Sequence, residues 1–492
     1  MKAGSWKAFV LVGLLCLTTS VLSAQTFTSL IDFEGTDGSG PGPIIQGLNG
    51  SFYGISGGGA GTFCGSSGCG MIFQITPAGK VITLYSFCTQ KNCPDGLSPS
   101  GLMQASNGNL YGTTNLRGAN HGGTIFELTP SGKFTTLYSF CAQANCADGS
   151  RPVGPLVEGS NQKLYGVTTN GGSTFCASGC GTMFSVTLGG QFTSLHSFCA
   201  IADCVKEGRN PEAGLVAAPN GNFYGTTFGG GTKQEGTVFT ITPAGAVTKL
   251  YNFYSLPNGA DGWFVQTSLT LGDDGNLYGT TNRGGVNGGG SVFKITPTGQ
   301  FTTVYSFCSV TNCADGSVPW VPVTLGSDGN FYGTTWAGGG ANDGVAYQIT
   351  PSGEDTTLHS FCSLVNCTDG ILPDGGLTQG TNGLFYGTTI YGGDHTCGNG
   401  NGCGVLYSIS MGLKPYVQPK PAFAPVGKQI QILGNNLTGT SSVTFNGTPA
   451  TFKVVSGTYI LATVPAGATT GPIEVTAPSG TLSSNVLFNV VP

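Results

Sequence analysis

The stretch Asn109-Leu110-Tyr111-Gly112-Thr113-Thr114 decides the fold of this chain, because its pattern returns along most of the sequence. A glycine-rich segment follows it, and then come Gly123-Thr124-Ile125-Phe126 and Leu137-Tyr138-Ser139-Phe140. The phrase recurs with a period of roughly 54 to 59 residues. A fixed period of this size is typical of repeat architectures, in which one unit is too small to bury its own core. The tyrosine of the Tyr-Gly pair stands at Tyr53, Tyr111, Tyr165, Tyr224, Tyr278, Tyr332 and Tyr386.

Each unit contains four short strand candidates, which in the second full unit are residues 101–105, 110–114, 124–129 and 134–140. These segments are rich in Thr, Tyr, Phe and Ile, and Gly, Asn and Pro separate them with turn chemistry. Four antiparallel strands repeated seven times predict a seven-bladed β-propeller over residues 25–411. We expect the aromatic rings of the Tyr-Gly pairs to pack between neighbouring blades.

The two ends of the repeat region complement each other. The last unit lacks an outer strand, whereas residues 27–33 at the start match residues 134–140 of the second unit. Counting that segment, each of the four strand types occurs seven times. The sequence therefore predicts that residues 27–33 complete the last blade and close the ring, which leaves no open sheet edge between the first and last blades.

The cysteines predict an oxidising compartment. Apart from Cys16, sixteen cysteines remain, and all fall into pairs that are close in sequence. Zinc sites use tighter pairs joined by further Cys or His ligands, and only four His are present, so we predict eight local disulfides that hold the shapes of loops at the surface. They are Cys64/Cys69, Cys88/Cys93, Cys141/Cys146, Cys176/Cys180, Cys199/Cys204, Cys308/Cys313, Cys362/Cys367 and Cys397/Cys403.

The start of the chain reads as a signal peptide over residues 1–24. Lys2 and Lys7 precede an apolar run, and small residues close at Ser23-Ala24. No later segment is apolar enough to span a membrane, and we expect a secreted, cell-surface or periplasmic protein. Charged residues make up only 8% of the chain, the net charge is -5, and no basic stripe exists, so nucleic acid is not an expected partner.

The repeated phrase also resembles a known family. Gly-Asn-Leu-Tyr-Gly-Thr-Thr, Gly-Thr-x-Phe-x-Ile-Thr and Leu-Tyr-Ser-Phe-Cys are similar to the GloVer tandem repeat of exported bacterial "choice-of-anchor" proteins, over roughly residues 26 to 410. The resemblance implies export and surface display, and it implies no activity.

Residues 412–492 form a different unit, with no cysteine and no repeat. Pro415, Pro419 and Pro421 predict a stiff linker. The strand candidates that follow, at 427–434, 442–446, 459–464, 471–476 and 486–490, predict a small β-sandwich. Segments 430–437, 443–447 and 464–467 closely resemble an immunoglobulin-like IPT/TIG domain, which implies a spacer or adhesive accessory.

One acidic residue precedes a glycine at the same point of every repeat. The simpler interpretation is a turn in which the carboxylate accepts hydrogen bonds from nearby backbone amides. The alternative is a rim of carboxylates that binds Ca²⁺ or a cationic ligand. His196 and His359 stand where other repeats have Tyr, and we interpret them as structural substitutions. The acidic residues are Asp37, Asp95, Asp148, Glu207, Asp261, Asp315 and Asp369.

The segment after each Tyr-Gly-Thr-Thr breaks the regularity of the repeat. In the predicted strand order this segment lies on the same face as the cysteine loops and the acidic turns. Aromatic and Arg side chains on stiff loops favour a ligand platform, while the alternative is that they merely cover neighbouring blades. The candidate ligand-binding residues are Arg117, Phe228, Arg283, Trp336 and Tyr391, joined by Trp263 and Trp320 after two of the acidic turns.

No nucleophile, metalloprotease or phosphate-loop motif is present, and we assign no catalytic residue, metal or cofactor. The leading hypothesis is a monomeric, non-catalytic binding or surface-interaction protein for an extracellular glycan, peptide or protein. The alternative is a carbohydrate-active enzyme, a polysaccharide lyase or glycoside hydrolase, that uses acidic residues of the same face.

Overall fold

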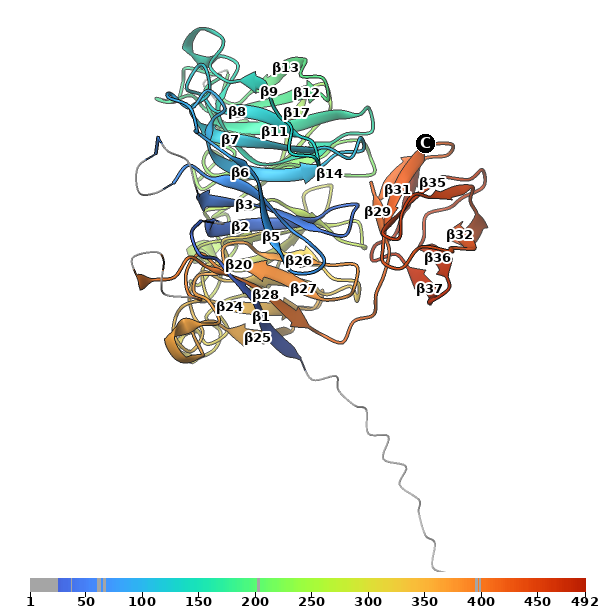
Figure 1. Cartoon of the computed structure of the whole chain (residues 1–492). Helices are drawn as coiled ribbons and strands as arrows, with labels where there is room; N and C mark the ends of the chain where they lie inside the picture. Colours follow the sequence, from blue (N-terminus) through green and yellow to red (C-terminus); the bar gives the residue numbers. More distant parts are fainter. Residues whose placement is uncertain are drawn as a thin grey trace, which may run out of the picture.

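The computed structural model describes residues 25–36, 38–59, 63–64, 68–200, 204–393, 397 and 400–492. Within these residues the repeat region forms seven antiparallel sheets of four strands each, arranged as blades around an axis (Figure 1). The first strands of neighbouring sheets contact one another, which places them innermost. The predicted signal peptide, residues 1–24, lies outside the described residues.

The blades follow one another along the chain, and in blades 1 to 6 the strands run in sequence order from the axis outward. Blade 1 is β2 (Ser39–Gln46), β3 (Phe52–Gly58), β4 (Met71–Ile75) and β5 (Val81–Ser86). Blade 2 is β6 (Leu97–Gln104), β7 (Leu110–Leu116), β8 (Thr124–Leu128) and β9 (Phe134–Ser139). Blade 3 is β10 (Ser150–Glu158), β11 (Lys163–Asn170), β12 (Thr182–Thr187) and β13 (Phe192–Ser197). Blade 4 is β14 (Val216–Ala217), β15 (Phe223–Thr227), β16 (Thr237–Ile241) and β17 (Val247–Asn252). Blade 5 is β18 (Thr270–Leu271), β19 (Leu277–Thr281), β20 (Ser291–Ile295) and β21 (Phe301–Ser306). Blade 6 is β22 (Thr324–Leu325), β23 (Phe331–Thr334), β24 (Val345–Ile349) and β25 (Asp355–Ser360).

Blade 7 combines the two ends of the repeat region. It consists of β26 (Leu377–Gln379), β27 (Phe385–Thr388), β28 (Val405–Ser410) and, as its outer strand, β1 (Thr26–Asp32). Strand β1 pairs antiparallel with β28, with Thr26 opposite Ser410 and Asp32 opposite Val405. The hydroxyl of Thr388 donates to the carbonyl of Gly42 at 2.9 Å, which joins blade 7 to blade 1. The predicted closure of a seven-bladed ring is confirmed.

The core lies between neighbouring blades rather than within one. The third strand of a blade is buried almost throughout, as in β8, whereas the outer strand β9 consists of half-buried and exposed residues. Aromatic rings join the blades: Phe134 of blade 2 stacks on Tyr85 of blade 1 with ring centroids 3.9 Å apart. Such burial of large apolar surface is the main stabilising contribution to folding.

Residues 418–491 form the predicted sandwich. One sheet has the order β29 (Gln418–Lys420), β31 (Gln429–Leu433), β35 (Tyr459–Thr463) and β34 (Phe452–Val454). The other has the order β33 (Thr448–Pro449), β32 (Ser442–Phe445), β36 (Ile473–Ala477) and β37 (Gly480–Ser483), and β30 (Phe423–Pro425) pairs in parallel with β38 (Asn489–Val491).

The expectation of a continuous Pro-rich linker is wrong at its end. Residues Gln418–Lys420 already form strand β29, which pairs with β31 of the sandwich. Because β29 lies at the edge of its sheet, Pro419 is tolerated there without the loss of a central ladder hydrogen bond.

The sandwich sits on one face of the propeller, where the turns between the first and second strands of the blades lie (Figure 1). Lys420 Nζ donates to the carbonyl of Gln46 at 2.8 Å, and Asn435 Nδ2 donates to Thr381 Oγ1 at 2.8 Å. The sandwich also contacts other blades. Gln431 donates to the carbonyl of Ser106 in blade 2 at 3.0 Å, and the amide of Leu487 donates to Asp273 in blade 5 at 3.3 Å. Burial lowers the pKa of Lys420 to about 8. The sandwich therefore occupies this turn face and leaves the opposite face open.

Among the residues that the structure describes, no helix combines the length and the apolar character that crossing a membrane would take.

Candidate functional site

The open face of the propeller, here called the loop face, carries both classes of cysteine loop. The connection that enters a blade packs against the loop that follows the second strand of that blade, as the hydrogen bond from Gly172 N to the carbonyl of Cys146 at 2.9 Å illustrates. All sixteen cysteines of the repeat region are joined in the eight local pairs expected from their spacing. Short helical turns stiffen five of the connections: η2 (Ala144–Cys146), α1 (Cys204–Glu207), η3 (Pro257–Gly259), η4 (Thr311–Cys313) and η5 (Val365–Cys367).

The disulfides belong to surface loops, as expected, but several of their cysteines are themselves buried, and Cys69 and Cys403 illustrate this. Cys69 is 0% exposed and Cys403 is 3% exposed. Each stands two residues before the third strand of its blade, β4 or β28, where the chain leaves the loop and enters the sheet. Cys69 packs in the apolar cluster between blades 1 and 2, and Cys403 packs in the cluster between blades 7 and 1.

These two cysteines therefore anchor their loops to the core and take no part in a ligand-binding surface. Their partners Cys64 and Cys397 are only half-buried, so each disulfide joins the loop above to the packing below. Five more of the paired cysteines are also buried, namely Cys88, Cys93, Cys180, Cys199 and Cys204.

The repeated acidic residues are enclosed by hydrogen-bond donors. Asp148 is fully buried, and it accepts bonds from Tyr138 Oη at 2.7 Å, from the amide of Ala142 at 3.0 Å and from the amide of Gln143 at 3.1 Å. Asp261 and Asp315 repeat this arrangement. A Ca²⁺ ion needs several free oxygen ligands, whereas these carboxylates are already occupied by N–H and O–H groups. The simpler interpretation, a structural turn, is the one that the geometry supports.

The same arrangement accounts for two of the histidines. His196 Nε2 lies 3.0 Å from Oε2 of Glu207, and His359 Nε2 lies 2.9 Å from Oδ2 of Asp369, where other blades have a tyrosine hydroxyl. Both histidines are therefore structural substitutes for tyrosine. Asp37, the seventh acidic residue of the set, lies outside the described residues.

The structure brings several of the predicted ligand-binding residues together as aromatic pairs. Trp320 and Trp336 of blade 6 lie with ring centroids 6.1 Å apart and are 43% and 40% exposed. Phe228 of blade 4 stacks on Phe264 of blade 5 at 5.2 Å, with planes only 12° apart. Tyr391 of blade 7 is 41% exposed. Phe264 was not among the predicted residues, because its contact with Phe228 joins two different blades.

Trp263 has a different environment. It is half-buried, its ring meets Tyr254 edge-on at 5.2 Å, and its backbone pairs with Arg283. Glycines at 259 and 284 leave room for the indole, since a Cβ at either position would lie 2.5 Å from a ring atom of Trp263. Trp263 thus covers its own blade rather than joining the exposed pairs.

The loop face also holds every arginine of the chain. Arg117, Arg151, Arg209 and Arg283 belong to blades 2, 3, 4 and 5, each at the loop end of the two inner strands. Arg117 and Arg283 were predicted as ligand-binding, whereas Arg151 and Arg209 were missed. The scarcity of arginine could have indicated them, because the whole chain has only these four arginines.

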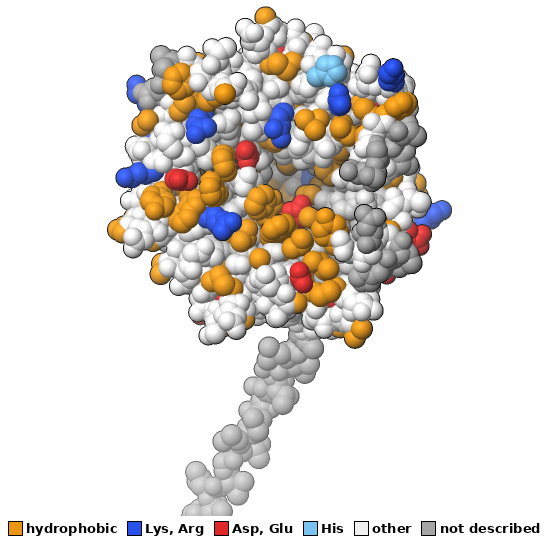
Figure 2. All heavy atoms as spheres, turned by 90° about the vertical axis from the view of Figure 1, so that its left-hand side faces the viewer, with side chains coloured by type: hydrophobic (Ala, Val, Ile, Leu, Met, Phe, Trp, Pro, Cys, Tyr) orange, Lys and Arg blue, Asp and Glu red, His pale blue; other side chains and the backbone are white. Residues whose placement is uncertain are grey.

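Figure 2 shows the loop face from outside. Hydrophobic side chains gather around a central hollow, and basic side chains are spread over the surface beside them (Figure 2). A few acidic side chains lie between them. The face thus offers apolar rings, cations and a concave centre together.

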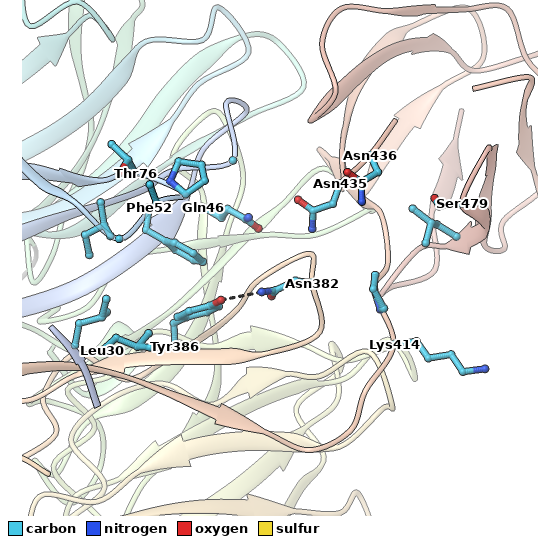
Figure 3. A pocket seen from close by; sticks show the side chains of 18 of the residues that line it. Leu30, Gln46, Phe52, Thr76, Asn382, Tyr386, Lys414, Asn435, Asn436 and Ser479 are labelled. Atoms are coloured by element: carbon cyan, nitrogen blue, oxygen red, sulfur yellow. Dashed lines mark hydrogen bonds between the residues drawn. The ribbon is translucent and has the colours of Figure 1, made fainter. Parts of the chain in front are cut away.

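A second candidate is the cleft of about 790 Å³ between the propeller and the sandwich (Figure 3). Leu30, Phe52 and Tyr386 line its propeller side, and Asn435 and Ser479 line its sandwich side. Tyr386 is partly exposed here, although the equivalent tyrosines of the other six blades are buried. At the turn face, the tyrosine between blades 7 and 1 is therefore less buried than its equivalents between the other blades.

The polar groups of this cleft already have structural roles. Asn382 Nδ2 donates to Tyr386 Oη at 2.8 Å, a bond that recurs as Asn107 to Tyr111 in blade 2, and Asn435 holds the sandwich on Thr381. We therefore regard the loop face as the stronger candidate site.

The described residues contain few groups that could serve as metal ligands. Their clusters of three or more His, Cys, Asp or Glu with ligand atoms within 4.8 Å consist of disulfide cysteines, joined in one case by Asp343. Disulfide sulfurs are not thiolates and do not provide the usual cysteine ligand.

The repeat phrase matches a family profile over residues 17–205 and 174–401, described as the Gloeobacter/Verrucomicrobia repeat. The chain belongs to this Gloeobacter/Verrucomicrobia repeat family. Residues 417–490 match the IPT/TIG domain, in agreement with the sandwich. No curated protein sequence matches the chain.

Several solved structures resemble this Gloeobacter/Verrucomicrobia repeat protein. A fungal alcohol oxidase of the AA5 family, solved in complex with copper, is 12% identical with a TM-score of 0.56, over 95% of this chain and 99% of that chain. The extracellular domain of a putative hybrid two-component system from Bacteroides thetaiotaomicron is 13% identical with a TM-score of 0.47, over 95% of this chain and 58% of that chain. PorZ, a surface component of the type-IX secretion system of Porphyromonas gingivalis, is 14% identical with a TM-score of 0.47, over 90% and 58%. At such identities the first likeness shows the fold alone.

Proposed function

We propose that this chain is a non-catalytic binding protein that acts outside the cytoplasm and holds a carbohydrate chain on its loop face. The observation that carries the proposal is the exposed pair Trp320 and Trp336, with the Phe228–Phe264 stack on the same face of the propeller. Flat rings exposed on a concave rim suit the apolar faces of sugar rings, and disulfide-stiffened loops lose little entropy on binding.

Eight disulfides support the location, because such bonds persist in oxidising compartments such as the extracellular space and the bacterial periplasm. The proposed signal peptide over residues 1–24 agrees with export. The sandwich, docked on the opposite face, leaves the loop face accessible to a large ligand.

Glycoside hydrolysis needs two carboxyl groups in unlike environments, one protonated and one ionised. The repeated acids Asp148, Asp261 and Asp315 are alike and occupied by donors. One observation favours the enzymatic alternative: burial raises the pKa of Asp374, which follows Pro373 at the start of the innermost segment of blade 7. A single acid without a marked partner is weaker support than the aromatic pairs.

The test is a glycan array probed with residues 25–492 in the oxidised state, followed by a titration against the best hit. We expect Trp336→Ala to weaken binding at least tenfold. Val426→Ala shortens a 49% exposed apolar side chain of the sandwich, away from the loop face, and serves as the control that keeps full binding. Failure of the wild type to retain any glycan would overturn the proposal, as would product formation that Asp374→Asn abolishes.

A further inference from the structure

We infer that the glycan held on the loop face is acidic, with carboxylate or sulfate groups that are recognised by an arc of four arginines. This inference rests on the proposed function and specifies the ligand class. The chain has four arginines, and all of them lie at the loop ends of the inner strands, one on each of four consecutive blades. The lysines, in contrast, also occupy turns of the opposite face, such as Lys133 between β8 and β9.

The arginines lie on blades in close contact. A Cβ at Gly101 would lie 2.4 Å from the backbone of Gly154, and a Cβ at Gly154 would lie 2.3 Å from the backbone of Gly214. The inner strands of blades 2, 3 and 4 therefore touch, so that Arg151 and Arg209 are placed on adjoining elements. A ligand that extends along the rim would meet the arginines one after another.

The nearest carboxylates in sequence do not neutralise Arg209. Glu207 is bound to His196 and to the amide of Cys199 at 2.5 Å, and Glu212 accepts from Gln266 Nε2 at 2.5 Å. Arg209 Nη1 donates instead to Asn210 Oδ1 at 3.0 Å. Among the residues described by the structure, none of the four guanidinium groups forms an ion pair with a carboxylate.

The chemistry of the arginine side chain further restricts the class of ligand. A guanidinium presents a planar fork of N–H groups that matches carboxylate and sulfate oxygens in two parallel hydrogen bonds. Arg117, Arg151 and Arg283 are exposed and free to turn toward a ligand, and Arg209 is half-buried. Blades 2 to 5 thus supply the arginines, while the two aromatic pairs and Tyr391 lie on blades 4 to 7. An acidic polysaccharide has both counterparts, a repeated anionic group and a sugar ring.

The experiment compares polygalacturonate with its fully methyl-esterified form, which has the same backbone without charge. Dextran sulfate, which carries sulfate but no carboxylate, separates sulfate from carboxylate as the source of the charge. We expect polygalacturonate or dextran sulfate to bind, the methyl ester to bind at least tenfold more weakly than polygalacturonate, and the affinity to fall with added salt. Arg151→Gln and Arg283→Gln should each weaken binding about tenfold, which is typical of losing one bidentate contact.

Two controls make the result specific. Lys133→Gln removes one exposed positive charge from the opposite face and should change affinity less than twofold, and Arg283→Lys keeps the charge but should recover only part of the loss. Thermal unfolding of each variant confirms that it is folded.

Equal binding of the ester and the acid, equal loss in Lys133→Gln, or equally tight binding of single-stranded DNA would overturn the inference. Binding of neutral glycans that the arginine variants leave unchanged would overturn it while the proposed function stands. If no polysaccharide binds at all, both fail.

Discussion

His359 Nε2 lies 2.9 Å from Oδ2 of Asp369, in the position where a tyrosine hydroxyl meets the equivalent carboxylate in other blades. The imidazole also stacks on Phe27 of the closing strand, with ring centroids 3.7 Å apart. One side chain thus joins a cysteine loop of the loop face to the strand that closes the ring.

The pKa of Asp369 provides a pH-dependent prediction. Burial would raise it, but hydrogen bonds from His359, from the hydroxyl and amide of Ser363 and from the amide of Leu364 prevail and lower it to about 2. A depressed carboxyl pKa adds stability that is present above the unfolded value near 4 and is lost as the pH falls through about 2. We expect Asp369→Asn to lower the free energy of unfolding by about 2 to 3 kcal/mol at pH 7 and by little at pH 2. Urea denaturation at both pH values measures this, and an equal loss at both would contradict it.

Asp355 gives the opposite pH dependence. Asp355 is the first residue of β25, and the equivalent residue of blade 5 is Phe301, the first residue of β21. Phe301 stacks on Tyr251 of the preceding blade with ring centroids 4.2 Å apart. Burial, with the charge of Asp315 adding to it, raises the pKa of Asp355 to about 7 despite a hydrogen bond from Tyr305. The protonated form is the stable one, so this contribution is present below about pH 4 and is lost as the pH rises through about 7.

We therefore expect Asp355→Phe to be more stable than the wild type by on the order of 2 kcal/mol at pH 8, and the difference to shrink toward pH 4. Unfolding free energies across this range provide the measurement. Asp355→Asn removes the charge without adding a ring, and it separates the electrostatic gain from the packing gain. Destabilisation by both substitutions at pH 8 would show that the carboxylate is needed.

Gly404 marks the seam between blades 7 and 1. Its φ is +100°, and a Cβ there would lie 2.2 Å from the carbonyl oxygen of Thr389 and 2.7 Å from Cδ of Pro41. Gly79 also has a positive φ, +79°, but no atom lies within 4 Å of its Cβ position. Both alanine substitutions carry the left-handed backbone cost of about 1 kcal/mol, and only Gly404→Ala adds a clash with backbone. We expect the melting temperature of Gly404→Ala to fall well below that of Gly79→Ala. Equal melting temperatures would refute close packing between blades 7 and 1 at Gly404.

The disulfide Cys141–Cys146 closes a loop with a sequence separation of 5. On the chain-entropy account such a short loop contributes about 2 kcal/mol. We expect replacement of both cysteines by serine to lower the free energy of unfolding by that amount. Because Asp148 is held by amides of this loop, ligand binding on blade 3 should also weaken. Chemical denaturation of the oxidised proteins tests this, and unchanged stability would argue against it.

Local patterns were sufficient to predict the architecture. The recurring Tyr-Gly pair, the turns between strands and the match of residues 27–33 to an outer strand predicted seven blades and their closure, because strand, turn and neighbour are encoded within one repeat. The linker was predicted too long, since Pro419 resembles a linker residue until the pairing of β29 with β31 is known.

Proximity in sequence likewise indicated the disulfide pairs, but it did not indicate their depth. The spacing predicted disulfides that hold surface loops, whereas Cys69 and Cys403 are themselves buried in the clusters between blades. Their burial depends on side chains of the neighbouring blade, such as Leu102 beside Cys69 and Phe73 beside Cys403, which no spacing within one loop reveals.

The repeat, the ring and the side chains available on the loops thus follow from the order of the residues alone. Which of those loop residues meet depends on the folded arrangement of the blades. Trp320 and Trp336 come from two loops of one blade, Phe228 and Phe264 from two blades, and the arginines from four. It also decided that the sandwich covers the turn face and leaves the loop face open (Figure 1). These relationships depend on packing between blades and between domains, where contacts join residues far apart in the chain and no local period encodes them.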